Sequence, residues 1–245
     1  MTRYSARLLP IVTMFLGYTF AQPAVSDRAG GYFAGGDDSR LWRFKVSLNK
    51  KEIGYHDFLV SGQGDQRMVK ISADFDVKFL FFNAYSYDHD NLEIWKDGCL
   101  QQIESETDVN GDLLKVVGGT VTDGFSVTAN ESSPTTISSS CVRSFAYWDP
   151  AFLESKQLLN SQTGEIVDVD ITDIGQESLV IDGQSVDAMR YQIAMKDGPI
   201  TLWYTLDTME WLALEAATEG GRTLRYEPIE LPSSNNIASV RLAER

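Results

Sequence analysis

Tight-turn dipeptides recur at short intervals along this chain, and they constrain its fold more than any other feature. Each Asp-Gly or Asn-Gly pair offers the positive backbone φ that a two-residue β-hairpin requires. These pairs occupy residues 97–98, 110–111, 123–124, 182–183 and 197–198. Between the turns, apolar and polar residues alternate with the period of a half-buried strand. In the first such segment one face carries Trp42, Phe44, Val46 and Leu48. The pattern predicts a mainly β domain, an antiparallel meander that forms a strongly curved sheet or barrel.

The segment Val77–Tyr87 departs from this alternation because it is apolar and aromatic almost throughout. Such a run is typical of a strand buried on both faces, and it also suits a strand that lines an apolar cavity. We therefore predict one strand here. Three of its rings, Phe79, Phe81 and Tyr85, become candidate ligand-binding residues.

The segment from Cys141 to Glu165 carries the best helix-start signal in the chain. Asp149 is a good N-cap residue, and Pro150 suits the first helical position. An apolar stripe would follow, made of Leu153, Leu158 and Leu159. Four aromatic residues crowd into the same stretch: Phe145, Tyr147, Trp148 and Phe152. We predict one short helix near residues 150–160 that packs these rings against the sheet as a plug or cap.

The N-terminus has the pattern of a secretory signal peptide. Arg3 and Arg7 precede the apolar run Leu8–Phe20, which is too short to span a bilayer comfortably. We place cleavage after Ala21 and expect a periplasmic or secreted protein; an uncleaved membrane anchor is the alternative. The predicted organisation is a signal peptide at 1–21, a flexible Gly- and Asp-rich leader at 22–39, a single β domain at 40–228 and a tail at 229–245.

The net charge of the chain is −14, and its acidic residues are spread along the sequence rather than gathered in a tail. Nucleic-acid binding requires clustered Lys and Arg against phosphates, so this composition argues against it. It argues equally against attraction to anionic lipid headgroups. No later stretch is apolar enough for a transmembrane helix, so we do not expect an integral membrane protein.

The chain contains two cysteines, Cys99 and Cys141, and no CxxC motif. In an exported chain they are a possible disulfide pair, because disulfides form in oxidising compartments. Whether the bond forms depends on the two Cα atoms coming within about 7 Å.

Several motifs, in their order along the chain, resemble an exported bacterial family known as a domain of unknown function. They are Trp42-Arg43-Phe44-Lys45-Val46 with Ile53-Gly54, Trp95-Lys96-Asp97-Gly98-Cys99-Leu100, Leu158-Leu159-Asn160 with Thr163-Gly164, Tyr191, and Leu202-Trp203-Tyr204. The resemblance spans about Leu41 to Tyr226 and implies an exported, all-β, barrel-like domain without an established activity or catalytic residue. Where the family is expected to carry an Asp after the Trp-Tyr pair, this chain has Thr205.

Groups suited to catalysis or metal binding are scarce. The two histidines, His56 and His89, have no partner at helical spacing, and a metal site would need them to converge with a carboxylate. Asp168 and Asp170 share one face of a predicted strand and could do acid–base work, although a solvated strand face is the commoner meaning of such a pair. Common hydrolase and nucleotide-binding motifs are missing from the sequence. We therefore assign no catalytic residue, no metal and no cofactor.

The abundant aromatic residues admit two interpretations: a packed core, or an apolar concavity for a hydrophobic ligand. The residues assigned to the second are Phe79, Phe81, Tyr85, Tyr147, Trp148 and Trp203. The leading hypothesis is a non-enzymatic exported protein that binds a hydrophobic small molecule or a cell-envelope component. The alternatives are an exported enzyme that uses His56, His89 or the Asp168/Asp170 pair, and a structural protein-interaction module.

Overall fold

The computed structural model describes residues 39–79, 82–196, 198–218 and 221–232. The predicted signal peptide, nearly all of the predicted leader and most of the predicted tail lie outside these ranges. The described residues form fifteen strands and one 3₁₀ helix, η2 (Pro150–Glu154). The strands are β1 Arg40–Leu48, β2 Lys51–Ser61, β3 Gln66–Phe79, β4 Phe82–Lys96, β5 Cys99–Val109, β6 Asp112–Val121, β7 Gly124–Ala129, β8 Thr135–Ile137, β9 Gln157–Leu159, β10 Ile166–Asp168, β11 Asp170–Ile181, β12 Gln184–Ala194, β13 Ile200–Thr205, β14 Trp211–Thr218 and β15 Arg222–Glu230.

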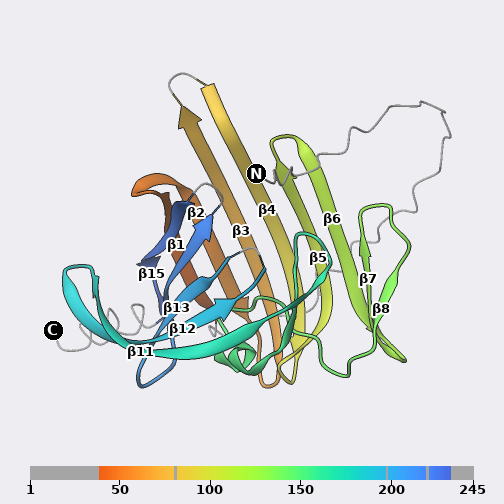
Figure 1. Ribbon diagram of the computed structural model, residues 1–245. Coiled ribbons are helices and arrows are strands. Elements are labelled where there is room, and N and C mark those ends of the chain that lie inside the picture. The colour runs from red at the N-terminus through yellow and green to blue at the C-terminus, as the bar shows by residue number, and fades with distance from the viewer. Residues whose placement is uncertain (1–38, 80–81, 197, 219–220, 233–245) are drawn as a thin grey trace, which may run out of the picture. The chain divides into compact units, whose positions relative to one another are not determined.

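Thirteen of these strands form one antiparallel sheet built from two meanders (Figure 1). The first meander runs from β1 to β8 and the second from β11 to β15, and the pairing of β1 with β15 joins them. Strands β9 and β10 form a separate two-stranded sheet. Within the described residues β8 and β11 are the two edge strands, so the sheet is curved but not closed into a barrel. The predicted mainly β fold with a strongly curved antiparallel sheet is confirmed.

One face of the sheet, called here the inner face, carries the core. Alternation along β1 buries Trp42, Phe44 and Val46 on this face and turns Arg43 and Lys45 outward. The strand register aligns inner-face side chains in rows across β1 to β5. The central row, called here the Ala73 row, is Phe44, His56, Ala73, His89 and Thr107. On one side of it lie Trp42, Phe58, Ile71, Asn91 and Ser105, and on the other Val46, Gly54, Phe75, Tyr87 and Val109.

The prediction of a single strand over Val77–Tyr87 is wrong. Strand β3 ends at Phe79 and β4 begins at Phe82, and the two pair as an antiparallel hairpin. The apolar run therefore lies at the tip of the two longest strands of the sheet, 14 and 15 residues long. Phe81 lies outside the described residues. Local sequence did not reveal the break because the segment contains no Gly or Pro to mark a turn.

The segment 141–165, called here the crossing segment, packs against the inner face. Its predicted helix is present but short: Asp149 caps η2 by accepting a hydrogen bond from the backbone N–H of Ala151, 3.1 Å away, and Pro150 is the first helical residue. The helix ends at Glu154, since Ser155 is extended. Leu158 and Leu159 therefore lie on β9 rather than on a helical stripe, and both are fully buried.

Covalent and backbone bonds tie the crossing segment to the β4–β5 hairpin. The structure joins Cys141 to Cys99 by a disulfide, with their Cα atoms 5.0 Å apart. The backbone N–H of Leu100 donates to the carbonyl of Val142 at 2.9 Å, and the Arg143 Nε donates to the carbonyl of Gly98 at 3.0 Å. The segment thus begins its passage across the sheet from a fixed point.

Aromatic contacts and hydrogen bonds hold the rest of the crossing segment in place. Trp148 packs edge-on against Trp95, with ring centroids 5.6 Å apart. The Tyr204 hydroxyl donates to the carbonyl of Tyr147 at 2.8 Å, and the Ser105 hydroxyl donates to the carbonyl of Ser161. The segment therefore contacts both meanders, as expected for a plug.

Replacing Gly54 tests how tightly β2 and β3 pack. A Cβ at this position would lie 1.8 Å from the carbonyl oxygen of Asp74, and the Gly54 φ of 151° is unfavourable for other residues. We expect Gly54→Ala to lower the free energy of unfolding by about 2–3 kcal/mol in a urea titration. Gly119→Ala is the matched control, because its added Cβ would meet no atom closer than 3.6 Å. Equal effects of the two substitutions would contradict the steric argument.

The disulfide closes a loop with a sequence separation of 42 residues. In the chain-entropy model, the Cys99→Ser/Cys141→Ser variant should be less stable by about 4 kcal/mol, because its unfolded chain regains conformational freedom. Urea unfolding of the variant and of the wild-type protein under reducing conditions would measure this loss. The two losses should agree; a loss below about 1 kcal/mol in both would show that the loop constraint contributes little.

Candidate functional site

Of the six aromatic residues predicted to bind a ligand, Phe81 lies outside the described residues, and the structure places Tyr147, Trp148 and Trp203 in different surroundings. Tyr147 and Trp148 belong to the crossing segment and pack into the core. Trp203 points to the outer face, where its Nε1 donates to Glu177 at 3.0 Å and Arg225 stacks over its ring. Tyr85 lies near the tip of β4 with a 37% exposed side chain, and Phe79 ends β3. The core interpretation therefore holds for Tyr147 and Trp148.

The sheet does bring the two histidines into one row. His56 on β2 and His89 on β4 flank Ala73 of β3, so their Cα atoms are about two strand spacings apart, or roughly 10 Å. His56 Nδ1 lies 3.0 Å from the Tyr226 hydroxyl, and His89 Nδ1 lies 2.8 Å from the Thr107 hydroxyl. These partners lie to opposite sides, toward β15 and β5. The two nitrogens of an imidazole flank Cε1 and point in widely different directions. Each Nε2 therefore points away from the hydroxyl that contacts Nδ1 of the same ring.

Aromatic rings surround the short Ala73 side chain. His56 lies 4.3 Å from the ring of Phe58 and 6.1 Å from that of Phe75, measured between centroids. Phe75 in turn stacks on Tyr87 at 5.2 Å. Ala73, whose side chain is a single methyl group, therefore lies between the two imidazoles in this row and has larger side chains as neighbours.

Burial keeps both histidines neutral. It lowers the pKa of His56 to about 3, and the nearby His89 adds to the shift. Burial likewise lowers the pKa of His89 to about 4, although Asp90 opposes this change. Neutral imidazoles can donate or accept one hydrogen bond at Nε2, according to the tautomer, and they can also bind metals.

Two buried polar atoms near Ala73 lack a hydrogen-bond partner within the described residues: Nε2 of His56 and Oδ1 of Asn91. Asn91 lies two residues from His89 on the same face of β4 and pairs with Ile71 across the sheet. Its Nδ2 donates to Oε1 of Glu93 at 3.0 Å, which leaves the carbonyl oxygen free. Unsatisfied buried polar atoms are uncommon in folded proteins, and the described residues contain three others: Nε1 of Trp42, Nε1 of Trp148 and Nε of Arg190.

Glu93, in contrast, is fully buried and well satisfied. Burial raises the pKa of its carboxyl group, and hydrogen bonds from Asn91, Trp95 and Ser144 offset part of this rise. The Trp95 Nε1 donates to Oε2 at 2.8 Å. Because Ser144 belongs to the crossing segment, Glu93 helps to hold that segment on the sheet. We interpret Glu93 as a structural residue.

The prediction from sequence did not include the buried polar residues of β4, although the alternation along this strand indicates them. Residues Tyr87, His89, Asn91, Glu93 and Trp95 alternate along β4, and all are buried. The fixed inward position of Trp95 implies that every second residue before it also points inward. The prediction missed this because it ended a strand at Tyr87, although β4 continues to Lys96.

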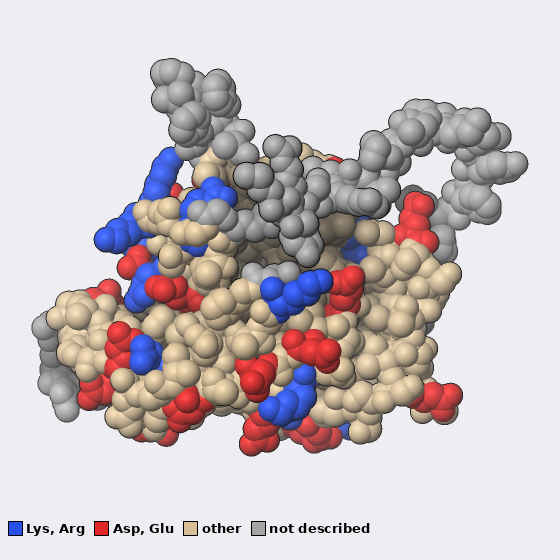
Figure 2. Space-filling model, in the orientation of Figure 1, with Lys and Arg blue, Asp and Glu red and all other residues tan. Residues whose placement is uncertain are grey.

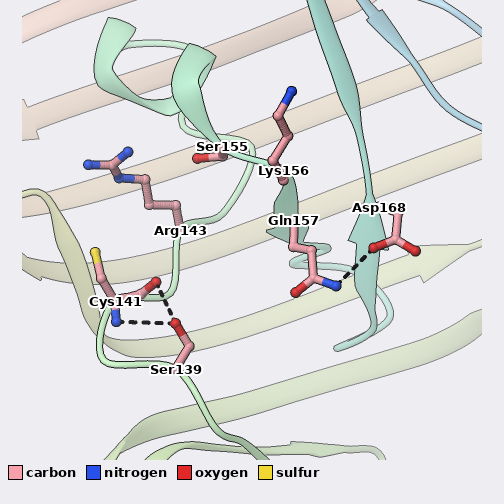
Figure 3. A pocket seen from close by; sticks show the side chains of 7 residues that line it. All are labelled: Ser139, Cys141, Arg143, Ser155, Lys156, Gln157 and Asp168. Carbon is pink, nitrogen blue, oxygen red and sulfur yellow. Dashed lines mark hydrogen bonds between the residues drawn. The ribbon is translucent and has the colours of Figure 1, made fainter.

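A second candidate is a polar pocket of about 510 Å³ beside the disulfide (Figure 3). It is lined by Ser139, Cys141, Arg143, Ser155, Lys156, Gln157 and Asp168. Figure 3 shows Arg143 and Asp168 pointing away from each other, and Gln157 donates to Asp168 at 2.8 Å. The Arg143 guanidinium already donates to the carbonyls of Gly98 and Ala151. No aromatic ring lines this pocket, so it does not fit a hydrophobic ligand.

The Asp168/Asp170 pair does not form a catalytic centre with the histidines. Both carboxylates are exposed; Asp168 accepts from Gln157, and Asp170 lies 3.8 Å from the Lys156 ammonium. Among the described residues, no three His, Cys, Asp or Glu side chains form a group that could hold a metal. Figure 2 shows acidic and basic side chains interspersed over the visible face, without a broad basic area.

Thr205, where the resemblance leads one to expect Asp, has a structural role. Its hydroxyl accepts the backbone N–H of Glu210 at 2.9 Å and lies 2.7 Å from the Thr208 hydroxyl. It thereby closes the turn between β13 and β14.

A family model for the domain of unknown function DUF6134 matches residues 44–229, most of the described β structure. The chain belongs to this family. The match and the structure confirm the expected kinship with all-β, barrel-like proteins of unknown function. No curated protein matches the chain.

Among solved structures, the fold is similar to the crystal structure of a beta-barrel-like protein of the domain of unknown function DUF1849 from Brucella abortus. The TM-score is 0.59 at 12% sequence identity, over 79% of this chain and 97% of that chain. At this identity the similarity concerns the fold alone. No helix within the described residues is long and apolar enough to cross a membrane.

The buried histidines predict an acid-sensitive stability. The pKa values of both histidines are lower in the folded state than in the unfolded chain. As the pH falls below about 6.5, the unfolded chain therefore binds protons that the folded protein does not. Stability should therefore decrease from pH 6.5 toward pH 4, with each histidine costing about 2 kcal/mol by pH 5. Urea titrations between pH 7.5 and pH 5 would measure this slope.

The double variant His56→Phe/His89→Leu serves as the reference for that slope. It should lose much less stability between pH 7.5 and pH 5 than the wild-type protein, because it lacks both groups. Identical slopes would show that the histidines are not held neutral in the folded protein.

Proposed function

We propose that this domain is an exported, non-enzymatic protein that binds a hydrophobic or amphipathic ligand from the cell envelope on its inner face. The observation that carries the proposal is the uneven cover of this face. Phe152, Leu158 and Leu159 of the crossing segment, and Trp211 packed against its Tyr147, are 0% exposed. Around Ala73, Ile71, Phe75 and Tyr87 each keep 8% exposure, and His56 is partly exposed although its Nε2 is buried.

The chemistry of this less covered part suits an apolar ligand. Phe75 and Tyr87 offer stacked rings, and Ala73 has the smallest side chain of its row. Ligand sites for hydrophobic molecules combine such apolar walls with a few polar groups that set orientation. His56 on β2 and Asn91 on β4 are the polar residues of this part of the inner face that have an unpaired atom.

The Cys99–Cys141 disulfide supports export, because disulfides persist in the periplasm and outside the cell and are rare in the reducing cytosol. An enzymatic role is less well supported. The described residues give His56 and His89 no carboxylate partner of the kind that activates a nucleophile or base.

Binding of N-phenyl-1-naphthylamine, an apolar fluorescent probe, to the purified full chain tests the proposal. We expect saturable 1:1 binding with enhanced fluorescence. Ala73→Leu should weaken binding at least about 10-fold, because the larger side chain would obstruct the inner face between His56 and His89. Ser72→Leu is the matched control: it adds the same side chain to the adjacent, exposed position on the outer face.

Two results would contradict the proposal. One is the absence of saturable probe binding by a folded wild-type protein, judged by its cooperative urea transition. The other is equal binding by the Ala73→Leu and Ser72→Leu variants, which would place the site away from the inner face.

A further inference from the structure

The outer face of the first meander carries a row in which apolar and charged side chains alternate. Strand register places one residue of each strand from β2 to β6 side by side in this row. In strand order these residues, called here the outer row, are Leu59, Lys70, Leu92, Glu104 and Val117. All five side chains are exposed.

The outer row belongs to a larger apolar patch. The next row on this face, toward the turn between β4 and β5, has no charged residue and consists of Ser61, Met68, Ile94, Gln102 and Gly119. Single exposed apolar residues are common on protein surfaces, but contiguous apolar patches mark interaction sites. In the outer row, Leu59, Leu92 and Val117 are 37%, 36% and 56% exposed and lie on alternate strands. The two rows together therefore offer a surface to a protein partner.

The two charges of the outer row have no partner within the described part of the chain. Lys70 and Glu104 lie one strand to either side of Leu92, so their Cα atoms are roughly 10 Å apart. Neither forms an ion pair with another described side chain. In the row on the other side, by contrast, ion pairs join Arg43 to Asp57 and Lys115 to Glu106. Lys70 and Glu104 are thus available to a second molecule.

We propose that the outer row is the contact surface of a symmetric dimer, in which a second copy of this chain packs its own outer row against it. A two-fold axis along β4 brings Leu92 of the two copies together at the centre. The same axis places Lys70 over the partner's Glu104, and Leu59 over the partner's Val117. The row is therefore complementary to itself, as an isologous interface requires.

The charges select this axis and limit the contact. A two-fold axis along the row, across the strands, would place Lys70 over the partner's Lys70, and like charges in contact are unfavourable. Asp90, the outer-face residue of β4 before Leu92, would lie opposite its own copy, so the contact extends from Leu92 toward Ile94 and not toward Asp90. Two rows across five strands make a small interface, and we expect weak, concentration-dependent association.

Sedimentation velocity of the purified full chain, from about 5 to about 500 µM, tests the proposal. We expect monomer at the lowest concentration and an increasing fraction of dimer as the concentration rises. Leu92→Asp should weaken dimerisation at least about 100-fold, because it places two carboxylates at the centre of the contact.

Charge reversal tests the pairing of Lys70 with the partner's Glu104. Lys70→Glu and Glu104→Lys should each weaken dimerisation at least about 10-fold, because each places like charges opposite one another. The double variant Lys70→Glu/Glu104→Lys should recover wild-type association, because both pairs form again with their signs exchanged. Lys196→Glu, at an exposed position between β12 and β13, is the matched control and should have no effect. The two single changes shift the net charge in opposite directions, so a general effect of net charge would not weaken both.

Three results would overturn the proposal. The first is a monomer at every concentration, which would leave the patch to a different partner. The second is an assembly that Leu92→Asp does not weaken. The third is a double variant that has the wild-type urea transition but does not recover association. None of these results bears on probe binding by the inner face, because the substituted residues lie on the opposite face of the sheet.

Discussion

A single curved layer of strands exposes its inner apolar face unless some other part of the chain covers it, and this requirement organises the whole molecule. The inner face carries large rings, including Trp42, Phe44, Trp95 and Trp211, each of which stabilises the fold by about 2–3 kcal/mol when buried. The crossing segment provides this cover. Its position depends on the disulfide at one end of the sheet and on contacts with both meanders. The packing of the core and the anchoring of this segment therefore depend on each other.

The same arrangement explains why polar residues gather where they do. Where the crossing segment lies on β4, the buried carboxyl group of Glu93 gains a hydrogen bond from Ser144. His56 and Asn91 each keep one unsatisfied atom, and the rings of Phe75 and Tyr87 keep some exposure.

Local sequence predicted much of the fold because hairpin geometry is a local property. Asp97, Asn110 and Asp182 adopt positive φ values of 51°, 57° and 50°, as the dipeptide signals require. At Asp123-Gly124 the turn lies one residue earlier, and Gly124 already begins β7. The break between β3 and β4 gave no such signal, and the helix predicted near 150–160 ended early because Leu158 and Leu159 gain more by pairing in β9 and packing on the sheet.

The sequence by itself determined the β class, the meander, most of the turns and the N-terminal start of η2, since each depends on residues within a few positions of one another. Only the tertiary structure decided which side chains meet. Tyr147 and Trp203 look alike as candidates in the sequence but end on opposite faces, whereas His56 and His89, 33 positions apart, lie in one row around Ala73. Strand register sets these outcomes, because a shift of one residue moves every side chain of a strand to the other face.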